Sequence, residues 1–332
     1  MASNVNVHNN HDQSDIFKNL RENIQLVSRQ ITDGVNTRKD AAEFDKETYW
    51  NKIAAIFKIL SMETTKLSLA FSKKPFPSNK NTEALVQEME KAILTLVSIY
   101  YSLPTSQGST LKSHLQQAVL QVLDNLQQFV LSLSDCINSQ SDKRIQWTGG
   151  VWEASNFVLL RDNRECVLKD LQETYELVQD ALQELEKASS IEMQDDLLDE
   201  DNDKWSEHDK TVISACGGLV KTLLSIVKKT RGCVEKSGDI STNEGISTLD
   251  ELSTLTSGVS SVVDDFVSGI YPPMDYDAFV QNGEVLSEVG RNIIKFLKDC
   301  KLTNNEDTKW LDFLTHACSH NLEKLKASVL PS

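Results

Sequence analysis

Apolar residues recur at intervals of three and four along most of this chain, and this spacing constrains the fold more than any other feature. Residues spaced in this way lie on one face of an α-helix. Glycine and proline, which interrupt helices, number only 13 and 6 among 332 residues, well below their usual combined share of about 12%. No stretch alternates apolar and polar residues over the length of a strand. The sequence therefore predicts an all-α fold of long helices with essentially no β-sheet.

The N-terminal half contains five long stretches with this spacing. An Asp-Gly pair and proline-containing turns separate the first four, and Gly149-Gly150 precedes a short segment, 151–160, that leads into the fifth. Proline lacks the amide hydrogen that a helix interior requires, so these turns mark helix ends. The predicted helices span about 14–32, 44–71, 82–103, 110–133 and 164–188.

An acidic run, "MQDDLLDEDNDK" at 193–204, follows the fifth helix and predicts a solvated linker, because it has little apolar surface to bury. Four further helices are expected after it. Three of them begin at a hydroxyl residue with an acid three positions on, which is the pattern of a capping box. These starts are Ser206, Ser241 and Thr303, and the remaining helix spans about 278–300.

Long helices joined by short turns bury their apolar stripes against antiparallel neighbours. The expected organisation is two antiparallel helical bundles of long helices joined by an acidic linker. In detail, residues 1–13 form a disordered N-terminus and 14–188 an N-terminal bundle of about five helices, while the spacing leaves open which bundle the helix at about 164–188 joins. Residues 189–204 form the linker and 205–330 a C-terminal bundle of about four helices.

The charge balance indicates which classes of partner the protein can bind. The chain has 34 basic and 49 acidic residues, a net charge of −15. Affinity for nucleic acid depends on lysine and arginine that displace counterions from phosphate, and the best basic run, 228–231, is short. We therefore expect protein partners, without direct binding to nucleic acid, a membrane or a small-molecule substrate.

Six widely spaced cysteines without a CxxC pair predict reduced, mostly buried thiols. The N-terminus lacks the apolar core of a signal peptide. The most apolar stretch, 93–103, is shorter than the roughly 20 residues that span a membrane. The predicted location is the cytoplasm and the nucleus.

The segment "HACSH" (316–320) is the best candidate for a metal site, because His316 and His320 share a helical face. Cys318, however, lies about 200° around the helix from either histidine, so the set is incomplete. The acidic run lacks the glycine that an EF-hand loop requires at its sixth position. Since no nucleophile motif or phosphate-binding loop appears either, we predict no enzyme activity, cofactor or metal.

The segment "DDFVSGIYPPMD" (264–275) brings a helix to two consecutive prolines. Pro272 and Pro273 form a stiff corner from which Tyr271 or Met274 can fold back as an apolar plug, or they form an exposed aromatic–proline epitope. We favour the structural role. Alanine at both prolines is then expected to lower thermal stability before it lowers binding.

Four segments together suggest a family. "EFDKETYW" (43–50), "LSLAFSKKPFPS" (67–78), "KWSEHDK" (204–210) and "DDFVSGIYPPM" (264–274) resemble signature segments of the cyclin-D-interacting proteins, also called GCIP. The resemblance implies a nuclear and cytoplasmic, all-helical protein that binds D-type cyclins and restrains phosphorylation of the retinoblastoma protein. It also implies a helix-loop-helix regulator without a basic region that keeps transcription factors off DNA.

The leading hypothesis is a non-enzymatic interaction protein that negatively regulates the cell cycle or transcription by binding D-type cyclins or helix-loop-helix factors. The alternative is a vinculin- or α-catenin-like adaptor in signalling or cytoskeletal assembly. The candidate partner-binding residues are the proline corner, the acidic run and the tryptophan that follows it. They are Tyr271, Pro272, Pro273, Met274, Asp199, Glu200, Asp201 and Trp205.

Overall fold

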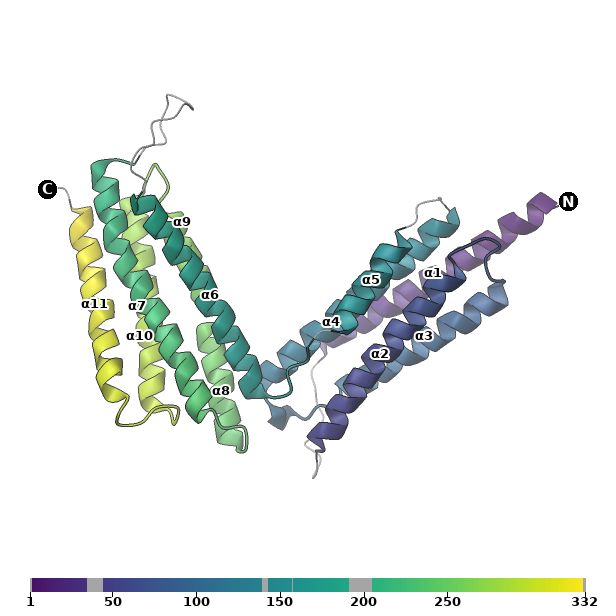
Figure 1. Ribbon diagram of the computed structural model, residues 1–332, viewed down its shortest axis with the longest axis horizontal. Coiled ribbons are helices and arrows are strands. Elements are labelled where there is room, and N and C mark those ends of the chain that lie inside the picture. Colours follow the sequence, from purple (N-terminus) through teal and green to yellow (C-terminus); the bar gives the residue numbers. More distant parts are fainter. Residues whose placement is uncertain (1, 35–43, 139–142, 157, 191–204, 331–332) are drawn as a thin grey trace. The chain divides into compact units, whose positions relative to one another are not determined.

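A computed structural model describes residues 2–34, 44–138, 143–156, 158–190 and 205–330 (Figure 1). These residues form helices and turns, with no strand among them. The prediction of an all-α fold is confirmed. The chain divides into two compact units, Met1–Arg161 and Asp162–Ser332. Asp199, Glu200 and Asp201 lie outside the described residues.

The first unit is a closed ring of helices. Helix α1 contacts α3 and α4, α2 contacts α3 and α5, and α4 contacts α5. Each helix turns its three-four stripe inward, and Leu20, Ile53, Met89 and Leu126 are fully buried. The elements are α1 (Ala2–Asp33), α2 (Lys46–Ala70), α3 (Asn79–Tyr100), the 3-10 turn η1 (Thr105–Gln107), α4 (Ser109–Asn138) and α5 (Arg144–Ser155).

Two details of this unit differ from the prediction. Helix α1 begins at Ala2, whereas disorder was predicted for residues 1–13. No proline or glycine interrupts residues 2–33, so the helix continues forward from its packed part. Gly149 and Gly150, predicted to precede a short segment, lie inside α5. A Cβ at Gly150 would lie 2.4 Å from the Asn125 side chain, so α4 approaches closely here.

The second unit is organised around α7 and α10. Helix α7 contacts α6, α10 and α11, and α10 also contacts α8, α9 and α11 (Figure 1). The elements are α6 (Asn163–Ser190), α7 (Glu207–Ser237), α8 (Asn243–Thr256), α9 (Val259–Ser268), α10 (Tyr276–Asp299) and α11 (Thr308–Val329).

The predicted division placed the helix at 164–188 in the N-terminal bundle, but the structure places α6 in the second unit. Its apolar stripe, which includes Val167, Leu171 and Val178, is buried in the core of that unit. Helix α6 packs along α7 and also contacts α8 and α9. The boundary between the units therefore falls after Arg161, ahead of α6, and not at 189–204.

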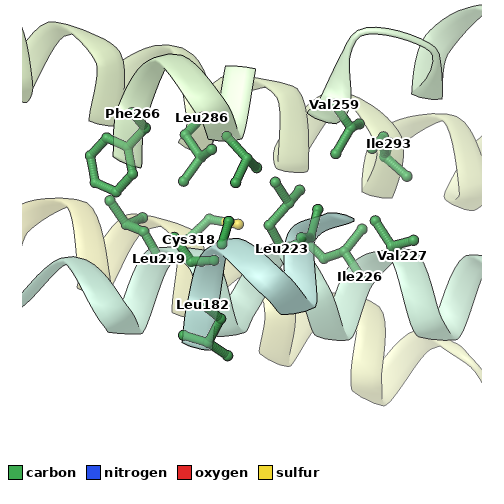
Figure 2. Close-up of a cluster of buried hydrophobic side chains, with 14 of the residues drawn as sticks. Leu182, Leu219, Leu223, Ile226, Val227, Val259, Phe266, Leu286, Ile293 and Cys318 are labelled. Carbon is green, nitrogen blue, oxygen red and sulfur yellow. The ribbon is translucent and has the colours of Figure 1, made fainter. Parts of the chain in front are cut away.

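The core of the second unit is a continuous apolar layer (Figure 2). Leu219 and Leu223 of α7, Leu286 of α10 and Cys318 of α11 all lie in this layer. Close backbone approach contributes at two positions on α10. A Cβ at Gly283 would meet Leu325 at 2.6 Å, and one at Gly290 would meet Ile226 at 3.0 Å. The shape of this core is therefore fixed by small residues as well as large ones.

The helix starts were predicted with mixed success. The capping box at Ser206 is confirmed, because its hydroxyl accepts from the Asp209 amide. The cap of α8 is Thr242, one residue after the predicted Ser241. Helix α11 begins at Thr308, five residues after the predicted start, because Asp307 accepts hydrogen bonds from the Asn304 amide and the Trp310 indole. These bonds hold residues 304–307 in a turn.

The helix that was predicted to begin at Ser241 is divided into α8 and α9 at Ser257 and Gly258. The hydroxyls of Thr256 and Ser257 donate to carbonyls three or four residues back. Such bonds compete with the backbone hydrogen bonds of a helix. Gly258, a residue that disfavours helices, follows directly.

Helix α7 is long and apolar enough to cross a membrane, which corrects the prediction that 93–103 is the most apolar stretch. In the structure, 56% of the 18-residue apolar window of α7 is buried. A helix at the centre of a bundle meets the same criteria, because neighbours cover most of its circumference. The apolar residues of α7 are accounted for by packing.

Candidate functional site

The proline corner joins α9 to α10 in the second unit, and Trp205 lies beside it. The Trp205 indole donates a hydrogen bond to the carbonyl of Ile270 at 2.8 Å. The Trp205 and Tyr271 rings lie with their centroids 6.5 Å apart. Residues separated by 66 positions in the sequence are thus brought to one surface at the N-terminus of α7.

The start of α7 and the start of α10 are tied together at this corner. The Asp209 carboxylate accepts from the Ser206 amide and hydroxyl, both at 2.7 Å. It also accepts from the Tyr276 hydroxyl at 2.6 Å. Burial opposes the charge, yet the bonds from Tyr276 and Ser206 hold the pKa of Asp209 below its ordinary value. The same carboxylate therefore caps one helix and anchors another.

The proline segment is firmly held on its inner side. Ile270 is fully buried, and Met274 packs against the core. A Cβ at Gly269 would lie 2.9 Å from the ring of Phe279, which stacks on Phe266 with centroids 4.7 Å apart. Only a glycine fits this approach without displacement. The structural role predicted for the corner is supported by these contacts.

The outer side of the corner is accessible. Tyr271 is 51% exposed, and Pro273 is also exposed. The Tyr271 hydroxyl donates to the Glu184 carboxylate of α6, and this bond raises the pKa of Tyr271. Of the two residues predicted as apolar plugs, Met274 folds inward and Tyr271 does not. The accessible face is therefore an aromatic ring beside a proline, with acids nearby.

Five of the predicted site residues thus meet at one place: Tyr271, Pro272, Pro273, Met274 and Trp205. Sequence reasoning missed Glu184 and Tyr276, which reach the corner from other helices. Glu184 carries no local signal. The Ser-x-x-Asp pattern at 206–209 did identify the cap, but it did not reveal that Tyr276 shares the same carboxylate.

The remaining chemistry-bearing residues show no assembled reactive site in the part of the chain that the structure describes. No group of three or more metal-ligating side chains was found there. Cys318 is buried while His316 and His320 are exposed, as the helical spacing predicts. Burial raises the pKa of Cys233 to about 11. It also raises the pKa of the Cys166 and Cys216 thiols.

The comparisons with known proteins cover nearly the whole chain. The family models of the N-terminal and C-terminal parts of Grap2 and cyclin-D-interacting proteins match residues 52–190 and 192–295. The cyclin-D1-binding protein 1 homologue of Xenopus laevis is 32% identical over 93% of this chain and 97% of its own length. The Danio rerio homologue is 32% identical over 94% of each chain. The human cyclin-D1-binding protein 1 is 26% identical over 93% of this chain and 92% of its own. The chain therefore belongs to the family of Grap2 and cyclin-D-interacting proteins.

Proposed function

We propose that this protein is a non-enzymatic regulator in the cytoplasm and nucleus that binds a D-type cyclin and thereby restrains the cell cycle. The observation that carries the proposal is the match to relatives named cyclin-D1-binding proteins, which spans both units and over 90% of each chain.

The burial of the apolar stripes favours docking of the folded protein over exchange of helices. A helix-loop-helix dimer requires two helices with free apolar faces. Here the stripes that include Leu126 in the first unit and Leu223 in the second are at most 2% exposed. Opening such a bundle would cost several kcal/mol. Binding to helix-loop-helix factors is therefore the second expectation, through the outer surfaces of the helices.

The corner at Tyr271 and Pro273 is the contact surface that we propose for the cyclin. Interfaces are enriched in aromatic anchors that can be buried without losing much side-chain entropy. Tyr271 has this character, and its neighbours hold it in place. Pro272 and Met274 contribute by fixing the backbone beneath it.

The test is a pull-down of purified full-length protein with a purified D-type cyclin, and in parallel with a basic helix-loop-helix factor. Tyr271→Ala is expected to weaken cyclin binding about tenfold or more, as an interface anchor does. Phe313→Ala is the matched control, because Phe313 is 69% exposed on α11 of the same unit. Absence of cyclin binding by the unaltered protein would overturn the proposal, and failure of both partners would favour the adaptor alternative.

A further inference from the structure

Helices α2 and α5 of the first unit expose large apolar side chains along the line where they meet. Met62 and Leu69 of α2 are 50% and 66% exposed, and Ile145 and Trp152 of α5 are 67% and 44% exposed. Gly149 lies between the two α5 residues, and a Cβ there would meet nothing within 4 Å. These five residues are called the α2/α5 surface. A globular protein normally leaves large apolar residues scattered, so a cluster calls for an explanation.

The spacing of these residues produces two parallel apolar rows. Met62 and Leu69 are seven positions apart, which is two helical turns. Ile145, Gly149 and Trp152 follow at intervals of four and three, so they also share one face. Helices α2 and α5 contact each other directly. The two rows therefore lie on either side of the contact between the two helices. The position of Gly149 is open, and this opening is called the notch.

Hydrogen bonds between the helices hold this line in place. The Trp152 indole donates to the Thr65 hydroxyl at 2.9 Å. Deeper in the line, the Thr148 hydroxyl and the Arg144 guanidinium each lie 2.9 Å from the Ser68 hydroxyl. The Trp152 ring is thus oriented while half exposed. A preorganised surface loses less conformational entropy when a partner binds.

The charges around the α2/α5 surface oppose the overall charge of the protein. Lys58, Lys66, Lys73 and Lys143 are exposed on α2, on the turn that follows it and just ahead of α5. The only acids between residues 46 and 74 are Glu47, in the first turn of α2, and Glu63, which is buried and paired with Lys66 at 2.5 Å. Glu153 is exposed on α5 four positions after Gly149, so one acid lies beside this surface. The surface is therefore an apolar strip bordered by lysines.

A second apolar groove in the same unit lacks the lysines that accompany the α2/α5 surface. The groove between α1 and α3 encloses about 350 Å³ and is lined by the exposed Leu26 and Leu94. Glu90 lies on its edge and accepts a hydrogen bond from Asn23, and no lysine lines it. That groove is lined by apolar residues and an acid and by no lysine, so it provides a control.

We propose that the α2/α5 surface docks an acidic amphipathic helix of a partner protein. Helix recognition in a groove uses anchors at i, i+3, i+4 and i+7, and the two rows offer complementary positions for them. The notch at Gly149 receives one anchor, and acids on the flanks of the partner helix face the four lysines. This goes beyond the proposed cyclin binding and does not depend on it.

Charge and apolarity together select this occupant. Nucleic acid is a poorer fit, because its affinity depends on lysine and arginine that neutralise phosphates, and the large exposed apolar side chains of this surface would gain nothing from it. A second copy of this chain is a poorer fit for the α2/α5 surface, because the two identical surfaces would bring like-charged lysines together.

The test uses the full-length protein and a synthetic peptide of about 20 residues, roughly six helical turns. Leucine recurs in the peptide at three-four spacing, glutamate occupies the flanks and alanine fills the remaining positions. One control peptide has the same composition in scrambled order, and another carries lysine in place of glutamate. Binding is measured by fluorescence anisotropy, and its location by the indole N–H resonance of Trp152, assigned through Trp152→Phe.

The expected result is that the glutamate peptide binds, shifts the Trp152 resonance and loses affinity as salt rises, while the control peptides bind at least tenfold more weakly. Gly149→Gln is expected to weaken binding at least tenfold without lowering the melting temperature. It fills the notch, meets no neighbour and replaces a poor helix former. Gly232→Gln is the matched control, since a Cβ at this exposed α7 glycine also meets nothing within 4 Å.

Two further variants separate the apolar and charged contributions. Leu69→Gln is expected to weaken binding as Gly149→Gln does, whereas Leu94→Gln in the α1/α3 groove leaves it unchanged. Lys58→Glu combined with Lys66→Glu is expected to reverse the preference between the glutamate and lysine peptides.

Three results would overturn the inference. One is equal affinity of the glutamate peptide for the unaltered protein and the Gly149→Gln variant. Another is a dimer in sedimentation that Gly149→Gln converts to a monomer, which would make the surface a self-association interface. The third is binding to phosphatidylserine vesicles without binding to the peptide. None of these bears on the cyclin pull-down, so failure of either proposal is recognised separately.

Discussion

The two units of this protein have the same fold class but opposite electrostatic character. Residues 1–161 contain 17 basic and 16 acidic residues, a net charge of +1, whereas residues 162–332 contain 17 basic and 33 acidic residues, a net charge of −16. The overall value of −15 therefore describes only the second unit. The repulsion of acidic protein partners that a net charge of −15 would produce does not apply to the first unit.

The units also differ in how their buried polar groups are satisfied. In the second unit, the Tyr276 hydroxyl is bonded to Asp209 and the Trp205 indole to Ile270. In the first, the hydroxyls of Tyr49 and Tyr100 are buried without a hydrogen-bond partner in the described residues. Burial raises the pKa of Tyr100 to about 12 and also raises that of Tyr49. The first unit also has polar bonds between helices, as from Arg144 and Thr148 to Ser68, so the contrast between the units concerns these tyrosines.

The largest effect is expected from cutting the chain at the wrong boundary. A fragment of residues 162–332 is expected to melt cooperatively, whereas a fragment of residues 205–332 is not, because removal of α6 exposes the faces of α7, α8 and α9 that it covers. Circular dichroism melts and the dispersion of amide resonances measure this difference. Equally sharp melts of the two fragments would show that α6 is not part of the second unit.

The predicted placement of α6 shows which information about the fold a three-four stripe carries. The stripe identifies Val167, Leu171 and Val178 as buried residues, and they are, but it does not identify the helix that buries them. The long acidic run after α6 predicts a boundary there, because linkers are usually polar. The contact of α6 with α7 is a tertiary fact that no local pattern contains.

The candidate site was predictable to the extent that its signals are local. Two prolines end a helix for steric reasons, and a serine three residues before an acid starts one, so the corner and Ser206 were found. The bonds from Tyr271 to Glu184 and from Tyr276 to Asp209 join residues 87 and 67 positions apart. Their pairing depends on how α6, α7 and α10 pack. The apolar stripe of α2 was predicted as one inward face, and the outward Met62 and Leu69 were missed.

The next largest effect compares one buried phenylalanine in each unit. Phe266→Ala in the second unit and Phe129→Ala in the first are each expected to cost about 3–5 kcal/mol of unfolding free energy, because both side chains are fully buried. Phe266 also loses its stacking on Phe279. Differential scanning calorimetry of the full chain is expected to show each substitution lowering a different transition. A uniform shift of one common transition would mean that the units unfold together.

A smaller effect concerns Asp209 and acid. Asp209→Asn is expected to cost about 1–2 kcal/mol near neutral pH, because the charged cap and a charge-assisted bond to Tyr276 are lost. The folded-state pKa of Asp209 lies below its ordinary value, so its stabilisation is complete above about pH 5 and disappears as pH falls below about 4. Urea unfolding of the second unit across this range measures the difference between the two proteins. A difference that did not shrink as pH fell below about 4 would contradict a role for the carboxylate charge.

The smallest effect tests the contrast in polar bonding between the units with one kind of substitution. Tyr276→Phe removes a hydroxyl bonded to Asp209 and is expected to destabilise the second unit by about 1 kcal/mol. Tyr49→Phe removes a buried hydroxyl without a partner in the described residues and is expected to leave the first unit unchanged or more stable by up to about 1 kcal/mol. Chemical unfolding at pH 7 compares the two variants. Destabilisation of the first unit by Tyr49→Phe would show that its hydroxyl is bonded, for instance to an ordered water, and the contrast between the units would then be one of solvation rather than of packing.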